Sequence, residues 1–199
     1  MKKVPKGKLF IISAVLLLLL QACMIPENFT AKILIREDGS YHFTYDGDLA
    51  SVFALAAIKE GTFTAENEAD MKDDEENLLK EPGFQSVEYK GNGRYRVSVE
   101  KAGQPGEEYH FISRDLQIIS ILQEAGNTLL IKTWEPGKQD IDQIRMLGAD
   151  MKGVLEVRVP RGKAVIENSS KQKPEKNKTH MIYSWQISME SPSAKIRLK

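Results

Sequence analysis

The sequence has one cysteine, Cys23, and three histidines among its 199 residues. A single cysteine excludes a disulfide within the chain. His42, His110 and His180 are far apart and do not have the spacing of a zinc site, so we predict no metal ligands. The sequence also has no G-x-S-x-G nucleophile motif. These residues assign no catalytic group and no cofactor, and they favour a non-catalytic protein over an enzyme.

Two short motifs resemble ligand-binding sequences but lack essential positions. GNGRYR (Gly91–Arg96) has no third glycine and joins two expected strands, whereas a dinucleotide-binding loop opens a helix. The acidic run DMKDDEE (Asp70–Glu76) lacks the alternating ligands and the closing glutamate of an EF-hand. We therefore expect a hairpin turn and a solvated helix face, respectively.

The chain has no excess of charge of either sign, with 28 basic and 28 acidic side chains. Removal of residues 1–22 takes away four lysines and no acidic residue. This leaves 24 basic and 28 acidic side chains, a formal charge of −4. Such a charge argues against nucleic acid as a partner.

No hydrophobic run is long enough to span a bilayer. The longest, LFIISAVLLLLL (Leu9–Leu20), would extend about 18 Å as a helix, against a hydrocarbon core of about 30 Å. Four lysines precede this run, and the first acidic residue is Glu27. A basic start, a short apolar segment and a small residue at its end predict a cleaved signal peptide over residues 1–22.

The end of this segment, LQAC (Leu20–Cys23), resembles the bacterial lipobox. The resemblance implies that Leu20, Gln21 and Ala22 are recognised by lipoprotein signal peptidase and that Cys23 is the lipid attachment residue. Its thiol would carry a diacylglycerol and its amine a further acyl chain such as palmitate. Each buried methylene contributes about 0.8 kcal/mol, so two or three chains anchor a protein stably. The alternative is an ordinary secretory signal with a coincidental cysteine.

The remaining chain divides into a tether and one domain. Because the first strand pattern begins near Phe29, residues 23–28 are predicted to be the lipidated cysteine and a short tether. At about 3.3–3.6 Å per residue, six residues reach about 20 Å at most. Residues 29–199 are long enough for a single domain, which would be held close to its membrane.

Alternating apolar residues on both sides of REDGS (Arg36–Ser40) predict a β-hairpin. A helix is expected from the DGD sequence (Asp46–Asp48) to Gly61, and an acidic helix over residues 64–83. A short helix is expected over Asp140–Leu147. Further alternating segments cover residues 85–89, 95–99, 118–123, 128–134, 155–159, 181–189 and 194–198. The predicted fold class is α+β, a mostly antiparallel β-sheet with an inserted helical pair packed on one face.

Four lysines, Lys171, Lys173, Lys176 and Lys178, fall in one polar loop between two expected strands. A membrane-tethered domain could use them on anionic headgroups, at about 1 kcal/mol per basic residue near the surface. The alternative is a solvated hairpin loop.

Two further segments resemble the LppM-like bacterial lipoproteins. They are ILIREDGSYHFTY, which follows the lipobox cysteine, and LEVRVPRGKAVIENSS with YSWQIS towards the C-terminus. The resemblance implies a lipid-binding-like α/β domain with a function in the cell envelope, and it supplies no catalytic residues.

The first hypothesis is therefore a membrane-anchored envelope lipoprotein that binds a lipid or another hydrophobic ligand. Its groove is expected on the Tyr183, Trp185 and Ile187 face or beneath the helix expected over Leu49–Ala56. The second hypothesis is a structural or assembly lipoprotein that binds another envelope protein, and the third is an enzyme.

The residue after Cys23 bears on location. Met24 stands where an aspartate would retain a lipoprotein at the inner membrane. In a bacterium with two membranes this favours the outer membrane, with the domain facing the periplasm.

Overall fold

The computed structural model describes residues 24–112, 118–125, 128–162, 165–189 and 194–198, whose strands form two sheets. The larger sheet has the order β10-β11-β8-β1-β2-β4-β3 and the smaller one β5-β6-β7-β12-β9. The larger sheet contains β1 (Met24–Ile35), β2 (Tyr41–Ser51), β3 (Phe84–Gly91), β4 (Arg94–Gly103), β8 (Lys152–Pro160), β10 (Glu175–Lys176) and β11 (His180–Ser188). The smaller sheet contains β5 (Tyr109–Phe111), β6 (Ile119–Glu124), β7 (Thr128–Thr133), β9 (Val165–Asn168) and β12 (Lys195–Leu198).

Neighbouring strands in the described residues pair antiparallel, except that β1 pairs parallel with β8. The described helices are α2 (Val52–Glu60), α3 (Ala65–Asp73), α4 (Glu75–Leu79) and α5 (Lys138–Met146). The prediction of an α+β fold with largely antiparallel sheets is confirmed. The division of the strands into two sheets was not predicted.

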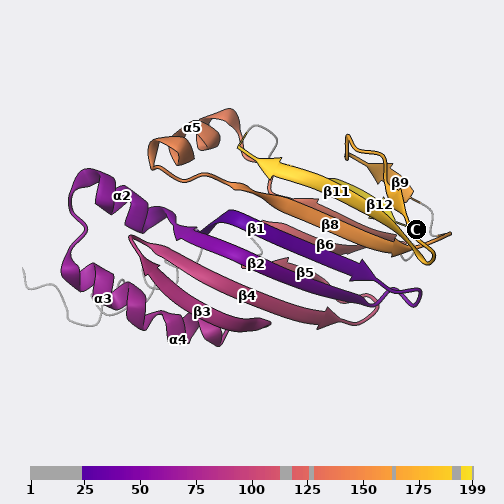
Figure 1. Cartoon of the computed structure of the whole chain (residues 1–199), viewed down its shortest axis with the longest axis horizontal. Coiled ribbons are helices and arrows are strands. Elements are labelled where there is room, and N and C mark those ends of the chain that lie inside the picture. The colour runs from indigo at the N-terminus through magenta and orange to yellow at the C-terminus, as the bar shows by residue number, and fades with distance from the viewer. Residues whose placement is uncertain (1–23, 113–117, 126–127, 163–164, 190–193, 199) are drawn as a thin grey trace, which may run out of the picture.

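The two sheets pack face to face (Figure 1). Aromatic rings join them: Phe43 lies 5.2 Å from Tyr109 and 5.4 Å from Phe111 between ring centroids, and Tyr45 lies 4.4 Å from Phe111. Side chains from both sheets belong to one hydrophobic cluster. Burial of this apolar surface is the main stabilising contribution to the fold.

The first hairpin forms as predicted. At its turn, the Asp38 carboxylate accepts a hydrogen bond from the backbone N–H of Ser40 at 2.9 Å, and Gly39 has the positive φ of 86° that favours glycine. The alternating residues Ala31, Ile33 and Ile35 are buried, which gives β1 one face in the core.

A bulge in β1 places Phe29 between two glycines. Asn28 has a φ of 45°, and the pairing with β2 shifts register between Glu27 and Thr30. A Cβ atom on Gly47 of β2 would lie 2.4 Å from the Phe29 Cβ, and one on Gly153 of β8 would lie 2.4 Å from the Phe29 ring. The neighbouring strands therefore need glycine at these positions because the Phe29 side chain occupies the space.

The first helix starts later than predicted. Asp46–Asp48 lie inside β2, where they pair with β4, because the β-ladder extends to Ser51. Ser51 caps α2, since its hydroxyl accepts a hydrogen bond from the N–H of Ala54 at 3.3 Å. Gly61 ends the helix in the left-handed conformation, as expected.

The acidic segment forms two helices, α3 and α4, instead of one. Thr64 and Asn67 form a capping box at the start of α3. At the break, the Asp74 carboxylate accepts a hydrogen bond from the Asn77 amide at 3.1 Å, a local contact that competes with helix continuation. Leu78 is buried, whereas Leu79 is 48% exposed.

The helices gather at the end of the molecule where β1 begins (Figure 1). Met24 pairs with Ser51, directly before α2. The segment that contains the four lysines runs along the outer edge of β11, from the level of Ser184 to the end of the larger sheet opposite Met24, where β10 pairs with Met181 and Ile182. We call the end with Met24 and the helices the helical end.

We expect Gly153→Ala to lower the free energy of unfolding by about 3 kcal/mol, because its methyl group would overlap the Phe29 ring. Urea denaturation followed by tryptophan fluorescence measures this. Gly137→Ala is the control, since φ is −68° there and the nearest neighbour of an added Cβ is an Asp140 oxygen at 3.3 Å. Equal effects of the two substitutions would contradict the packing of Phe29 against Gly153.

Candidate functional site

Met24 is the common element of three hollows at the helical end. It is the first residue of β1 and only 7% exposed. Its side chain lines a hollow between the two sheets, a second between α2 and α3, and a third beneath α5. The start of the central strand therefore lies where these cavities meet.

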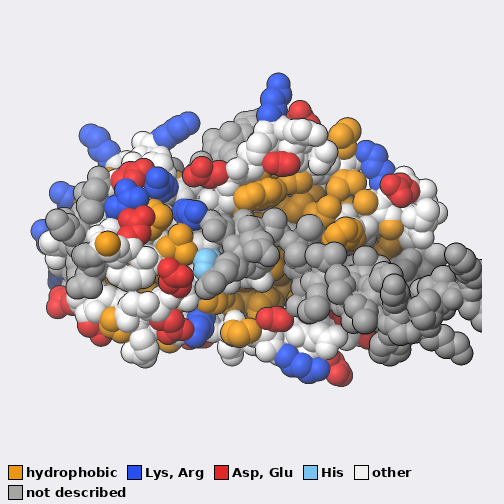
Figure 2. Space-filling model, turned by 180° about the vertical axis from the view of Figure 1, so that it is seen from behind, with side chains coloured by type: hydrophobic (Ala, Val, Ile, Leu, Met, Phe, Trp, Pro, Cys, Tyr) orange, Lys and Arg blue, Asp and Glu red, His pale blue; other side chains and the backbone are white. Residues whose placement is uncertain are grey.

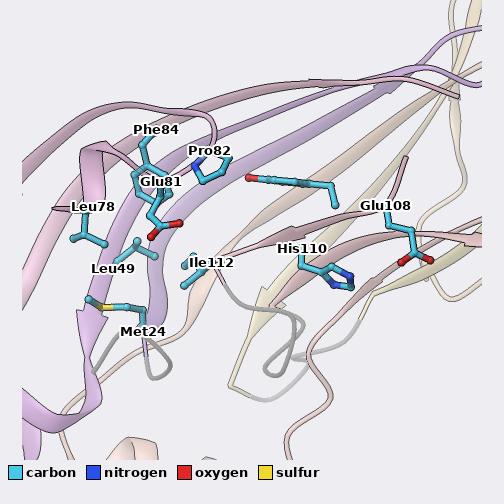
Figure 3. Close-up of a pocket in the computed structure, with 10 residues that line it drawn as sticks. Met24, Leu49, Leu78, Glu81, Pro82, Phe84, Glu108, His110 and Ile112 are labelled. Atoms are coloured by element: carbon cyan, nitrogen blue, oxygen red, sulfur yellow. The ribbon is translucent and has the colours of Figure 1, made fainter. Parts of the chain in front are cut away.

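The intersheet hollow has a volume of about 300 Å³ (Figure 3). Its lining residues are Met24, Leu49, Leu78, Glu81, Pro82, Phe84, Glu108, Tyr109, His110 and Ile112. They come from β1, β2, α4 and β3 on one side and from β5 and its flanks on the other. The volume is at the lower limit of about 300 Å³ for ligand pockets in proteins.

Polar groups stand among this apolar lining. Burial raises the pKa of the Tyr109 phenol well above its usual range, so the phenol stays protonated at neutral pH. His110 contacts the Ser120 hydroxyl through Nδ1 at 3.2 Å. The Glu81 carboxylate is directed towards Leu49 and Ile112 (Figure 3). An apolar cavity with a few polar groups can bind an amphiphilic molecule.

The backbone at the hollow is strained at Ile112, whose φ is 69°. A β-branched residue in the left-handed region is an outlier that costs about 1–3 kcal/mol. Such strain persists when surrounding contacts fix the residue, and Ile112 packs against the core cluster.

The α2–α3 hollow has a volume of about 280 Å³ and lies beneath the first helix. Phe53, Ala54 and Ala57 of α2 line one side, and Met71 of α3 lines the other. Tyr95 closes the bottom and donates a hydrogen bond to the carbonyl of Met71 at 2.7 Å. A hollow is therefore present beside this helix, at one of the two positions where we expected a groove, and its use as a binding site stays a prediction.

The α5 hollow is the smallest of the three, about 180 Å³, and is lined by the start of β1, by Ile118 and Trp134 next to β6 and β7, and by residues of α5 and its C-cap Leu147. A buried carboxylate positions the chain after α5. Glu27 is 5% exposed and accepts hydrogen bonds from Arg94 Nε at 2.9 Å and from the N–H of Asp150 at 2.7 Å. Arg94 also donates to the carbonyl of Gly148 at 3.1 Å. These contacts join β1, β4 and the α5–β8 connection.

The predicted lipid attachment site is not described by the structure. Leu20, Gln21, Ala22 and Cys23 all lie outside the described residues. The predicted tether over residues 23–28 is wrong from Met24 onwards, because Met24–Asn28 form the start of β1. The pairing with β2 before the bulge, Met24 with Ser51 and Glu27 with Asp48, explains the difference.

Lys171, Lys173, Lys176 and Lys178 are exposed, and Lys176 lies in the short strand β10. They lie along the outer edge of β11, in the half of the larger sheet farther from Met24. Met24 and Leu34, which is level with Arg158 of β8, are ten residues apart along β1, or about 33 Å. If the domain is anchored through Cys23 with its strands perpendicular to the membrane, these lysines are held away from the bilayer. Contact between the lysines and lipid headgroups therefore stays a prediction that this geometry does not support.

The other expected groove is not formed. Tyr183, Trp185 and Ile187 are at most 5% exposed and belong to the hydrophobic core. Trp185 Nε1 donates to the Ser169 hydroxyl at 3.2 Å. These side chains line none of the three hollows at the helical end.

The described residues contain no group of three or more His, Cys, Asp or Glu side chains placed to hold a metal ion. Among the helices of the described ranges, none has the length and apolar character needed to cross a bilayer. His42 lies 2.8 Å from Glu100 and His180 2.7 Å from the Thr179 hydroxyl, so the histidines have separate surroundings. Figure 2, seen from behind, shows hydrophobic side chains across the middle of this face, with charged side chains around them.

We expect Glu27→Ala to lower the free energy of unfolding by about 2–3 kcal/mol. It leaves Arg94, which is about one-third exposed, and the Asp150 N–H without their acceptor. Hydrogen exchange should quicken in α5 and residues 147–151 more than in β2. Glu88→Ala is the control, because Glu88 and Lys90 are both exposed, and its effect should stay below about 0.5 kcal/mol. A similar small effect of Glu27→Ala would refute this role.

No known family model matches the chain, and no curated protein matches its sequence. The function is therefore argued from the geometry of the helical end.

Proposed function

We propose that the protein is a non-catalytic, lipid-anchored envelope lipoprotein that binds a lipid or another hydrophobic ligand in the intersheet hollow. The observation that carries the proposal is the position of Met24. Adjacent Cα atoms lie about 3.8 Å apart, so acyl chains on Cys23 would start beside the residue that lines all three hollows. The anchor would hold the hollows at the bilayer, where a hydrophobic ligand is available.

Exposed apolar side chains at the helical end support this orientation. Phe53 of α2 is 47% exposed and Met146 of α5 is 61% exposed. One side-chain contact links the two helices: Lys59 of α2 donates a hydrogen bond to the carbonyl of Met146. Apolar side chains of this kind, close to a lipid anchor, can enter the headgroup boundary of a membrane.

The helices inserted after β2 would serve as a cover for the ligand. α4 contacts β3, and Leu78 extends from α4 into the intersheet hollow. The inserted helical pair, which we expected to pack on one face of the sheet, would in this way cover one side of the hollow through Leu78. In a bacterium with two membranes, we propose the outer membrane as the location, with the domain in the periplasm.

Lipid extraction tests ligand binding. We expect a hydrophobic molecule to be present in about equimolar amount in organic extracts of the purified protein, detected by mass spectrometry. Leu78→Trp should reduce this amount several-fold, because the larger side chain fills the intersheet hollow.

Leu79→Trp is the matched control. Its site is the adjacent residue of α4, is 48% exposed and lines none of the three hollows. It should retain the bound molecule. Equal amounts in both variants would assign the co-purifying lipid to the surface and contradict the proposal. An empty wild-type protein that also takes up no added envelope lipid would favour the alternative, a structural lipoprotein that binds another envelope protein.

Fluorescence quenching tests the orientation. We expect the tryptophan of Phe53→Trp or Met146→Trp to be quenched by brominated phospholipids when the lipidated protein is in vesicles, because these side chains would enter the bilayer boundary. The parent protein, with its two native tryptophans, gives the background signal.

Lys173→Trp is the control, at an exposed position along the outer edge of β11 in the half of the larger sheet farther from Met24. It should show no quenching beyond the background. Stronger quenching at Lys173→Trp than at Phe53→Trp would reverse the orientation and would restore the lysine loop as the membrane contact.

A further inference from the structure

The charged side chains that line the three hollows, counted among the described residues, all have the same sign. Glu81 and Glu108 line the intersheet hollow, Asp70 and Asp74 the α2–α3 hollow, and Asp140 the α5 hollow. Among the described residues that line them, none is a lysine or an arginine. A pocket for a fatty acid or a phosphate head would need a cation or several aligned donors.

Some of these carboxylates have structural roles. Asp140 accepts a hydrogen bond from the N–H of Gly137 at 2.9 Å, at the start of α5. Asp74 accepts from Asn77 at 3.1 Å. Both are therefore engaged within the helical end.

The two carboxylates of the intersheet hollow are free to meet a ligand. Glu81 and Glu108 are both exposed and form no ion pair with a lysine or arginine of the described residues. Glu108 accepts one long hydrogen bond, from the N–H of Gln123 at 3.4 Å. The Glu81 side chain is directed into the hollow (Figure 3).

Acidic residues around the intersheet hollow add to its negative electrostatic potential. Residues 65–81, which form α3, α4 and the start of the next loop, contain eight acidic and two basic side chains. Charge of one sign around a cavity with apolar walls focuses the potential at its entrance. A positively charged group gains from this potential, and an anion is repelled.

We propose that the intersheet hollow binds an amphiphile with a positively charged head, such as an alkyl amine, and discriminates against carboxylate heads. This rests on the proposed function. The apolar part lies against Met24, Leu49 and Leu78, and the head lies beside Glu81. Glu108, on the far side of His110, adds to the negative potential of the hollow (Figure 3). Repulsion of a carboxylate head contributes to selectivity as much as attraction of a positively charged head.

Photolabelling of the full-length protein, purified from membranes and placed in phosphatidylcholine nanodiscs, tests this. Three probes carry the same diazirine-bearing alkyl chain and differ in the head: an amine, an alcohol or a carboxylate. Labelled peptides are quantified by mass spectrometry and normalised to the bilayer content of each probe. We expect the amine to label peptides that contain Leu49, Leu78 or Ile112 about fivefold more than the carboxylate, with the alcohol between them.

The double variant Glu81→Gln/Glu108→Gln should reduce this preference to below about twofold. Glu37→Gln, at an exposed position in the turn after β1, should keep it. High salt should weaken the preference in the wild-type protein, because exposed charges are screened. The salt dependence is measured on the wild-type protein, so it does not depend on the stability of any variant.

The outcomes separate the inference from the proposed function. If all three probes label the hollow equally, or the carboxylate labels it best, the head selectivity is refuted while ligand binding stands. If no probe labels the hollow and all label the surface alike, ligand binding in this hollow is refuted as well.

Discussion

The pairing of β1 on both of its edges is the constraint on which the arrangement of the molecule depends. β2 pairs with β1 from Met24 to Ile35, and β8 pairs with it from Phe29 to Leu34. A strand with partners on both sides cannot shift, because a slip of one residue would turn its buried side chains to the other face. This fixes Met24 at one end of the sandwich, with the helices around it and the three hollows against its side chain.

The two ends of the molecule differ in chemistry as a result. The helical end has apolar hollows and acidic rims, and the far end has the exposed lysines and the first hairpin turn. The buried Glu27 carboxylate and the Phe29 ring lie between these ends, near the start of β1, where they connect three neighbouring strands and the segment after α5. These contacts close to Met24 hold the walls of the hollows in place while the surface helices remain exposed.

Local patterns in the sequence were sufficient to predict the first hairpin, the end of the first helix at Gly61 and the buried face formed by Leu155, Val157 and Val159. The alternation of apolar residues and the residue types at turns depend only on positions close together in the chain. Local patterns were insufficient where contacts between residues distant in sequence determine the structure. DGD has the composition of a helix cap, but pairing with Arg96–Ser98 of β4 keeps it in β2. Met24 and Glu27 were assigned to a tether because their partners, Ser51 and Asp150, are distant in sequence. The positions of the hollows could not be predicted from local patterns either, apart from the one beside the first helix.

The parallel pairing of β1 with β8 sets an order of events during biosynthesis. Phe29 is among the first residues of the fold to be made, but its neighbour Gly153 follows only after β2 to β7 and α5. Until then one edge of the central strand remains open, and contacts of such long sequence separation form slowly. The core around Phe29 therefore closes only after most of the chain has been made, and the N-terminal hairpin must wait for β8 before both edges of β1 are paired.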